Sequence, residues 1–217
     1  MSKYEKEYWI RADPDGKIRT REEERHLVIE DNKDVLSYIH KLKPGKILDY
    51  GCGMGFLLSA VDNKWEKYGI DKSEYAKKIA RKYASIVDNV EDGSMDVIIN
   101  THVIEHVDNP EELIYYFWYK LKEGGKLIIT TPNGDSGCAR RFGNNYRMLH
   151  DPTHKDLLSD TRLREILEHV KFHVDNVEYP FFETRHFTKE NLMRLFDTTK
   201  VSPPFYGNIM TFYCTKL

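Results

Sequence analysis

Short apolar runs, each about as long as a buried strand, alternate along most of this chain with stretches in which apolar residues recur every three or four positions. The runs predict strands at residues 46–49, 65–70, 84–90, 96–101, 126–131, 172–179 and 209–214. The other stretches predict helices at residues 23–42, 55–61, 73–83, 108–123, 159–170 and 189–196. This alternation favours an α/β fold built on a parallel, doubly wound sheet.

The glycine-rich segment that follows the first predicted strand is the most informative stretch. Asp49 ends the strand, and Gly51, Gly53 and Gly55 follow at alternate positions before Phe56. Glycines at this spacing allow a tight turn and leave room for a ligand to lie against the main chain. The dinucleotide-binding fingerprint has its third glycine where this chain has Phe56, so the segment departs from a standard nicotinamide site.

Composition narrows the class of protein. The chain has 217 residues, 40% of them apolar and 31% charged, which is enough for one domain with a substantial core. Its net charge of −2 counts against a nucleic-acid partner. We find no apolar run near the ~20 residues of a membrane span and no signal-peptide core in the charged start, so we expect a cytoplasmic protein. Three widely spaced cysteines predict neither a disulfide framework nor a zinc ribbon.

Two further features extend the glycine segment into a larger pattern. Asp71 ends the second predicted strand, 20 residues after Gly51, where an acid can accept hydrogen bonds from a ribose. Residues 100–107, Asn-Thr-His-Val-Ile-Glu-His-Val, follow the fourth strand. In this order and at this spacing, the three features resemble class I S-adenosylmethionine-dependent methyltransferases over about residues 45–133. They are most similar to the ubiquinone-biosynthesis-like branch of that family.

The resemblance implies an α/β, Rossmann-like, doubly wound seven-stranded sheet with strand order 3-2-1-4-5-7-6 and strand 7 antiparallel. It implies S-adenosyl-L-methionine as the cofactor and S-adenosyl-L-homocysteine as the product. We expect a single methyltransferase domain over residues 1–217. Its parts are an N-terminal arm and helix (1–44), a cofactor-binding half (45–133) and an acceptor-side half (134–217). In the arm, Tyr4, Tyr8 and Trp9 are apolar enough to pack.

The same resemblance implies which residues hold the cofactor. They lie at the ends of the first four strands and are Asp49, Gly51, Cys52, Gly53, Asp71, Lys72, Asp88, Asn89, Thr101 and His102. Asp49 and the glycine segment would hold the methionine end, because an acid suits an ammonium group. Asp71 would hold the ribose, or instead cap the helix that follows. Thr101 would lie beside the sulfonium, and Asp88 or Asn89 would contact the adenine.

Histidines supply the candidates for a general base, which helps an alcohol acceptor to lose its proton. His154 is the first choice, because it stands just before a predicted helix in a region that faces the methyl group in related enzymes. His150 is the second choice, and His186 is a further candidate.

A metal site is the competing interpretation of the histidines. Glu105 and His106, with His102 or with a third ligand from His150 or His154, have the chemistry to hold zinc or a harder divalent ion. The pattern resembles metal-dependent methyltransferases that act on RNA termini, but those have a glutamate where this chain has His102. We therefore expect no metal, with Glu105 and His106 bracing the loop under the cofactor.

Polar residues after the fifth strand predict the acceptor side. The candidates are Arg140, Arg141, Tyr146, Arg147 and Arg185. Arginine forks bind phosphate oxygens in a bidentate manner, although the same residues could form a solvated basic face. The segments 138–147, 181–186 and 201–208 resemble bacterial methyltransferases encoded among surface-polysaccharide genes. That resemblance implies O-methylation of a sugar or of a phosphorylated capsule precursor.

Two other classes of function stay open at this point. A nicotinamide-dependent oxidoreductase would use the same glycine segment and strand-end acid, but Phe56 counts against it. A non-catalytic S-adenosylmethionine-binding subunit would keep the glycine segment and lack acceptor chemistry, and the polar residues after the fifth strand count against that. We expect a small-molecule acceptor, and the sequence carries no signal for an oligomeric state.

Overall fold

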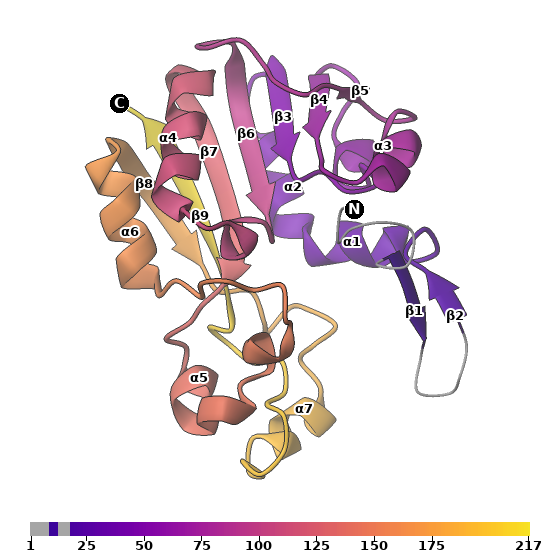
Figure 1. Cartoon of the computed structure of the whole chain (residues 1–217), viewed down its shortest axis with the longest axis vertical. Helices are drawn as coiled ribbons and strands as arrows, with labels where there is room; N and C mark the ends of the chain where they lie inside the picture. The colour runs from indigo at the N-terminus through magenta and orange to yellow at the C-terminus, as the bar shows by residue number, and fades with distance from the viewer. Residues whose placement is uncertain (1–8, 13–17) are drawn as a thin grey trace.

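The computed structural model describes residues 9–12 and 18–217 of the chain. Its centre is a seven-stranded sheet in the order β5-β4-β3-β6-β7-β9-β8 (Figure 1). The strands are β3 Lys46–Tyr50, β4 Glu66–Ile70, β5 Ser85–Ile86, β6 Met95–Thr101, β7 Leu121–Pro132, β8 Phe172–Glu178 and β9 Ile209–Lys216. Since β9 is antiparallel to both neighbours and the other pairs are parallel, the predicted order 3-2-1-4-5-7-6 with an antiparallel seventh strand is confirmed.

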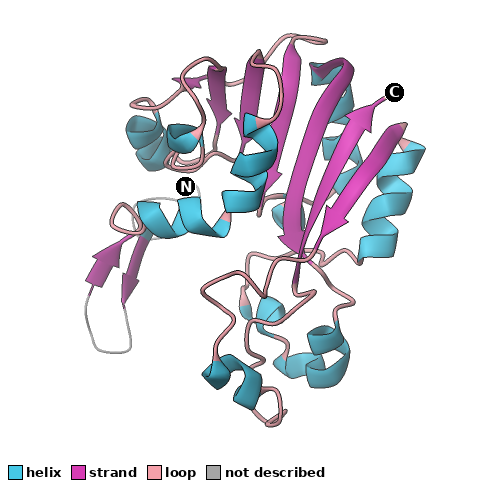
Figure 2. Cartoon of the chain, turned by 180° about the vertical axis from the view of Figure 1, so that it is seen from behind, coloured by secondary structure: helices cyan, strands magenta, loops and turns pink. Residues whose placement is uncertain are grey.

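The central strands are buried on both faces. Leu48 of β3 and Ile98 of β6 pack into one apolar cluster, while Ile47 and Ile99 pack into the cluster on the other face. Helices α4 Pro110–Lys120 and α6 Asp160–His169 cover the first face, and α2 Lys33–His40 covers the second (Figures 1 and 2). Burial on both sides explains why these strands are apolar throughout and do not alternate.

The N-terminal region differs from the prediction of one helix over residues 23–42, which is wrong. Two short helices form, α1 Arg25–Asp31 and α2. Asn32 separates them with φ of −110° and ψ of 18°, and its side-chain amide donates to the Val28 carbonyl at 2.8 Å. A hairpin of β1 Ile10–Ala12 and β2 Ile18–Thr20 precedes α1. Tyr4 and Tyr8, which we expected to pack, lie outside the described residues.

The prediction of a helix over residues 55–61 is also wrong, because only a 3₁₀ turn forms there, at Leu58–Ala60. Phe56 packs into a small cluster with α1 and α3 Glu74–Ala80. Leu57 and Leu58 pack instead into the cluster on the sheet face that α2 covers. Consecutive apolar residues thus face two different clusters, which one helical face cannot do. The third predicted strand shrinks from residues 84–90 to β5.

A small lobe lies below the carboxyl ends of the strands (Figure 1). We define it as residues 134–158 and 180–208, which include α5 Gly137–Phe142 and α7 Lys189–Arg194. Its two segments are joined by hydrogen bonds from the Arg147 amide to Ser202 Oγ at 3.0 Å and from the Ser202 amide to the Asn145 carbonyl at 2.8 Å. Within the described part of the chain, no helix is long and apolar enough to cross a membrane.

Candidate active site

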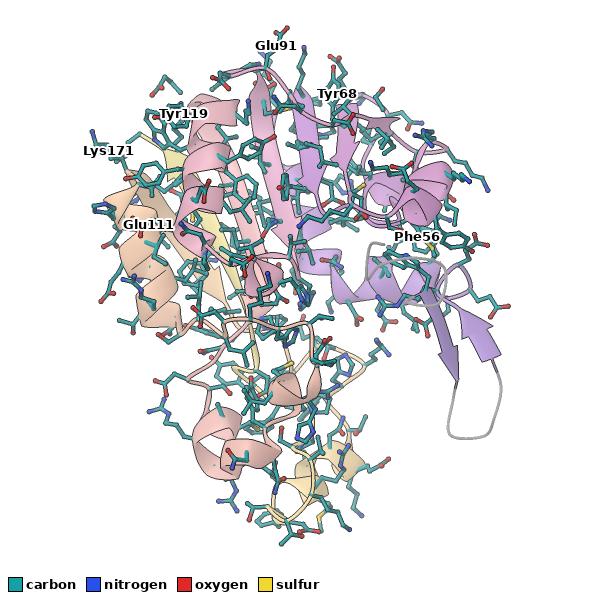
Figure 3. All side chains as sticks on the ribbon, in the orientation of Figure 1. Phe56, Tyr68, Glu91, Glu111, Tyr119 and Lys171 are labelled. Atoms are coloured by element: carbon teal, nitrogen blue, oxygen red, sulfur yellow. The ribbon has the colours of Figure 1, made fainter. Side chains whose placement is uncertain are left out.

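The carboxyl ends of β3, β4, β6 and β7 open onto one cavity of about 760 Å³, which α1 and the lobe complete. Tyr68 and Glu91 mark the opposite end of the sheet, away from this cavity (Figure 3). The strand order reverses between β3 and β6, and open α/β sheets bind ligands outside the carboxyl ends of their strands at such a point. The cavity also has the size of a small-molecule site.

The glycine segment forms one wall of the cavity in a backbone conformation that side chains would not allow. Gly51, Gly53 and Gly55 have φ values of 84°, 52° and 74°. A Cβ atom at Gly51 would lie 2.2 Å from Val103 Cγ2, and one at Gly55 would lie 3.1 Å from the Ala80 Cα. The glycines are therefore needed both for the left-handed backbone and for close packing.

The amide groups of this segment are directed inward. Gly51 and Cys52 donate to the Ile70 carbonyl at 2.7 and 3.0 Å, and Gly53 donates to Asp71 Oδ2 at 2.8 Å. These three amides are therefore already bonded within the protein. Cys52 is buried, and burial raises the pKa of its thiol far above its ordinary value.

Asp71 links the glycine segment to the end of β4. Its Oδ2 accepts from Gly53 and its Oδ1 accepts from the Ser73 amide at 2.8 Å. Ser73 itself caps α3, because its hydroxyl accepts from the Ala76 amide. Ser73 is therefore the helix cap, and Asp71 is a separate carboxylate at the end of the strand. Each Asp71 oxygen keeps a second lone pair for a ligand.

Two buried polar groups lie on the cavity wall between these elements. Burial and the neighbouring Asp71 raise the pKa of Asp49 to about 7. Thr101 Oγ1 is buried and has no hydrogen-bond partner among residues 9–12 and 18–217. A polar ligand can supply what both groups lack. It can offer a positive charge to the Asp49 carboxyl and a hydrogen-bond partner to the Thr101 hydroxyl.

His102 and Glu105 form a pair at the end of β6. His102 has a left-handed φ of 54°, and its Nδ1 lies 3.2 Å from Glu105 Oε1. Thr131 donates to Glu105 Oε2 at 3.1 Å. Burial opposes ionisation of Glu105, but the hydrogen bond and charge of His102, a backbone hydrogen bond and the charge of His106 together outweigh it and lower the pKa of Glu105. The neighbouring Glu105 carboxylate raises the pKa of His102 above its ordinary value.

His106 and His154 lie beside this pair, one from the sheet edge and one from the lobe. Their ring centroids are 4.8 Å apart. His106 Nδ1 lies 3.1 Å from the Thr153 carbonyl, and His154 Nδ1 lies 2.6 Å from the Met148 carbonyl. The sequence offered Glu105 and His106 with His102, His150 or His154 as a third residue. The structure places His154 in a group with Glu105 and His106, whereas His150 is exposed and is not in this group.

The outer wall of the cavity is closed by an ion pair between distant parts of the chain. Arg185 Nε and Nη2 donate to the two carboxylate oxygens of Asp31 at 2.9 and 2.8 Å. Lys33 donates to the Glu183 carbonyl at 2.5 Å. We call this Asp31–Arg185 contact the clasp, because it joins α1 to the lobe across the cavity.

Several predicted site residues lie elsewhere in the described structure. Those that do not line the cavity are Asp88, Asn89, Arg140, Arg141, Tyr146 and His150. Asn89 accepts from the hydroxyl of Tyr116 in α4 at 3.0 Å, and Arg141 donates to the Leu195 carbonyl at 2.9 Å within the lobe. Tyr146 is buried, and its hydroxyl donates to the Asn133 carbonyl at 2.9 Å. Arg147 and Arg185 do line the cavity.

Trp9, Phe181 and Phe205 lie on the cavity wall; Trp9 was expected from the sequence only to pack, as it does, and Phe181 and Phe205 were not singled out. Trp9 lies against the glycine segment, and its Nε1 donates to Ser73 Oγ at 3.2 Å. Phe181 and Phe205 of the lobe contact each other with ring centroids 5.0 Å apart. The only signal for the lobe rings was a local excess of aromatic residues, which does not distinguish a cavity wall from a core.

Comparison with known proteins identifies a protein family that matches most of the chain. A family model described as a methyltransferase domain matches residues 21–177. The chain is 27% identical over 191 residues to the ubiquinone biosynthesis O-methyltransferase of Xylella fastidiosa, which covers 77% of this chain and 76% of that enzyme. It is 28% identical over 140 residues to the Idiomarina loihiensis enzyme of the same name, which covers 56% of this chain and 55% of that enzyme. The chain thus spans about half the length of the latter relative.

Solved structures agree on the fold. A SAM-dependent methyltransferase from Archaeoglobus fulgidus superposes with a TM-score of 0.65 at 21% identity, over 88% of this chain and 94% of that chain. At this identity the likeness supports the architecture alone.

Proposed function

The chain belongs to the methyltransferase-domain family and is an S-adenosylmethionine-dependent methyltransferase, and from that premise we propose that it O-methylates a sugar or a phosphorylated precursor of a surface polysaccharide such as capsule. The observation that carries this proposal is the single cavity that the glycine segment, Asp71 and the lobe share. All three cysteines are buried free thiols, which supports a reducing, cytoplasmic compartment.

The residues at the sheet edge fit the cofactor. S-adenosylmethionine supplies a methyl group on a positively charged sulfur that is already activated for transfer. Asp71 offers carboxylate lone pairs to ribose hydroxyls, with Lys72 beside it on the wall. Asp49 offers a buried carboxyl to an ammonium group, whose charge would favour its ionised form. Thr101 offers a hydroxyl that lacks a partner within the described residues. Asp88 and Asn89 are not part of this proposal, because they lie outside the cavity.

We assign the general base to His102 in preference to His154. The bond to Glu105 orients the His102 ring, and its other nitrogen is left for the cavity that the residue lines, with 47% of the side chain exposed. His102 directly follows Thr101, so it stands at the cofactor side of the cavity, where an acceptor hydroxyl must approach. His154 faces His106 instead, and His150 is outside the cavity.

The lobe side of the cavity supports an acceptor with an apolar face and an anionic group. Phe181 and Phe205 offer ring surfaces on which the C–H face of a sugar can stack. Arg147 and Arg185 reach the same cavity, and guanidinium groups bind phosphate oxygens in pairs. Arg140 and Arg141 are not part of this proposal, because they do not line the cavity and instead contact Asp135 and Leu195 of the lobe.

A second candidate acceptor is a compound of ubiquinone biosynthesis. The names of the relatives favour it, and the aromatic wall suits a ring as well as a sugar. The two candidates differ in charge, because only the first requires the arginines.

The test begins with calorimetric titration of S-adenosylhomocysteine, which we expect to bind one to one. Transfer of labelled methyl groups is then measured to sugar phosphates, nucleotide-linked sugars and phenols. With a confirmed acceptor, His102→Ala should lower turnover by about 10²–10⁴-fold, the usual contribution of a general base, while His150→Ala leaves turnover unchanged. Transfer to phenols alone would select the second candidate, and full activity of His102→Ala would remove the base assignment.

A further inference from the structure

Trp9 lies on the cavity wall beside Asp71, the carboxylate that follows β4. Its indole Nε1 donates to Ser73 Oγ at 3.2 Å. Its six-membered ring packs on Gly53, where a Cβ atom would lie 3.0 Å from Trp9 Cη2. Gly53 and Ser73 are also the two residues whose amides bind the Asp71 carboxylate, each at 2.8 Å. The indole and the carboxylate therefore join the same two points of the wall, and a ligand that reaches Asp71 must come close to the indole.

The Trp9 ring is held in position by its neighbours. The Arg21 amide donates to the Trp9 carbonyl at 2.9 Å, and the Arg21 guanidinium lies 5.4 Å from the ring centroid, within reach of a cation–π contact. The ring also packs against the cluster that contains Met54 and Phe56. A side chain that is already ordered by such contacts loses little freedom when a ligand binds, which favours affinity.

The surroundings of Trp9 differ from those of a tryptophan that only fills the core. Trp65 is such a residue, with 4% exposure among buried apolar side chains. Trp9 is instead partly exposed, and it borders a glycine turn and a carboxylate on the wall of a cavity. A carboxylate can accept from the hydroxyls of a ribose, while a flat aromatic ring covers its C–H groups. Trp9 and Asp71 together offer both kinds of contact.

We propose that Trp9 is a cofactor-contacting residue, whose indole packs on S-adenosylmethionine held at Asp71. The inference rests on the cofactor site of the proposed function and is independent of the acceptor. The family model that matches this chain begins at residue 21, so Trp9 adds a contact from a segment that precedes the matched residues. The cofactor then links the N-terminal arm to the sheet, because it binds both Trp9 and the strand-end carboxylate.

Tryptophan fluorescence can report this contact directly. The chain has three tryptophans. Trp65 is in the core, and Trp118 lies in α4, with the Lys216 ammonium 4.0 Å from its ring centroid. Among the described residues, the cavity wall includes Trp9 but neither of the other two. A change in emission when a ligand fills the cofactor site is therefore expected to come from Trp9.

The test is a titration of S-adenosylhomocysteine into the full chain, followed by fluorescence and by calorimetry. We expect the emission of the parent to change on saturation, and the change to be lost in Trp9→Phe and kept in the control Trp118→Phe. Trp9→Ala should weaken binding by about 3–10-fold, the effect of one lost aromatic contact. Trp9→Phe, which keeps a ring but loses the bond to Ser73, should weaken binding less. Thermal unfolding of each variant without ligand establishes that it is folded at the temperature of the titration.

The outcomes separate this inference from the proposed function. A ligand-dependent change in emission that persists in Trp9→Phe would overturn the contact, and so would an unchanged affinity of folded Trp9→Ala. Weaker binding by Trp9→Ala only at temperatures at which the free variant unfolds would show that Trp9 has a structural role alone. A parent that does not bind S-adenosylhomocysteine would overturn the cofactor site and this inference together. Binding with the expected Trp9 effects, but with no methyl transfer to any tested acceptor, would support this inference and count against the proposed acceptor.

Discussion

The two sides of the cavity are built in different ways. On the sheet side, each polar residue comes directly after a strand or at its end, as Asp49, Asp71 and Thr101 do. On the lobe side, the wall combines segments that are distant in the chain, as the bond between Asn145 and Ser202 illustrates. Strand ends of a parallel sheet meet at one edge whatever the loops do, whereas the lobe wall exists only after its two segments have paired.

This difference predicts different sensitivities. The sheet side is held by a backbone that tolerates no added atoms, so small changes there should abolish cofactor binding. The lobe side is joined to α1 by the clasp, which is partly exposed. An exposed ion pair contributes little to stability, so changes at the clasp should affect only the acceptor.

Gly51→Ala should have the largest effect. The added methyl group would lie 2.2 Å from Val103 Cγ2, so the segment must shift, and we expect S-adenosylhomocysteine affinity to fall by at least about 100-fold, roughly 3 kcal/mol. Gly93→Ala is the control, because Gly93 also has a positive φ, of 60°, and the described chain places no heavy atom within 4 Å of the added carbon. Calorimetry measures the S-adenosylhomocysteine affinity of both variants. Equal affinities would contradict the conclusion that the backbone on the sheet side tolerates no added atoms.

Asp49→Asn should have a pH-dependent effect. With a pKa of about 7 in the free protein and about 3.9 in the unfolded chain, Asp49 retains a proton on folding that the unfolded chain releases. Stability of the parent therefore falls as pH rises from about 4 to 7 and levels off above, a loss of a few kcal/mol that the Asp49→Asn variant would not suffer.

Ligand binding should show the opposite trend. The ionised carboxyl suits an ammonium group, so parental affinity for S-adenosylhomocysteine should rise about tenfold per unit up to pH 7. Asp49→Asn should bind weakly at every pH. Thermal unfolding and calorimetry at pH 5, 6, 7 and 8 measure the two trends, and a parent affinity that is flat across this range would refute the role of Asp49.

Arg185→Ala should have the smallest effect. The clasp is partly exposed, with Arg185 at 39% and Asp31 at 35%, so the loss of stability should be within about 1 kcal/mol. We expect unchanged S-adenosylhomocysteine affinity and an acceptor KM raised by roughly 3–10-fold, as for the loss of one hydrogen bond of ordinary strength. Arg140→Ala, outside the cavity, should leave KM unchanged.

Asp31→Asn sharpens this prediction. If Arg185 binds an acceptor phosphate, release from Asp31 should lower KM. If Arg185 serves only to close the cavity through the clasp, Asp31→Asn should raise KM as Arg185→Ala does.

The sequence alone was enough for the central strands and for the glycine turn on the sheet side of the cavity, whereas the strand order was implied by the resemblance to class I methyltransferases. A strand buried on both faces needs a continuous apolar run, and a left-handed, closely packed turn needs glycine. Both requirements act on residues close together in sequence. The short segments around Ile47, Gly51 and Asp71 are therefore sufficient to predict the strands and the turn. The local pattern was misleading after Gly55, because that run predicted a helix. In the structure its apolar residues pack into two different clusters.

Tertiary structure alone decided the lobe side. Whether Arg141, Tyr146 or Arg147 faces the cavity depends on how the lobe folds on itself, which no short-range pattern encodes. The choice between His150 and His154 beside His106, and the clasp between Asp31 and Arg185, likewise depend on contacts between distant segments. Such contacts are selected by the packing of the whole chain, because the energy of each exposed pair is too small to determine the arrangement by itself.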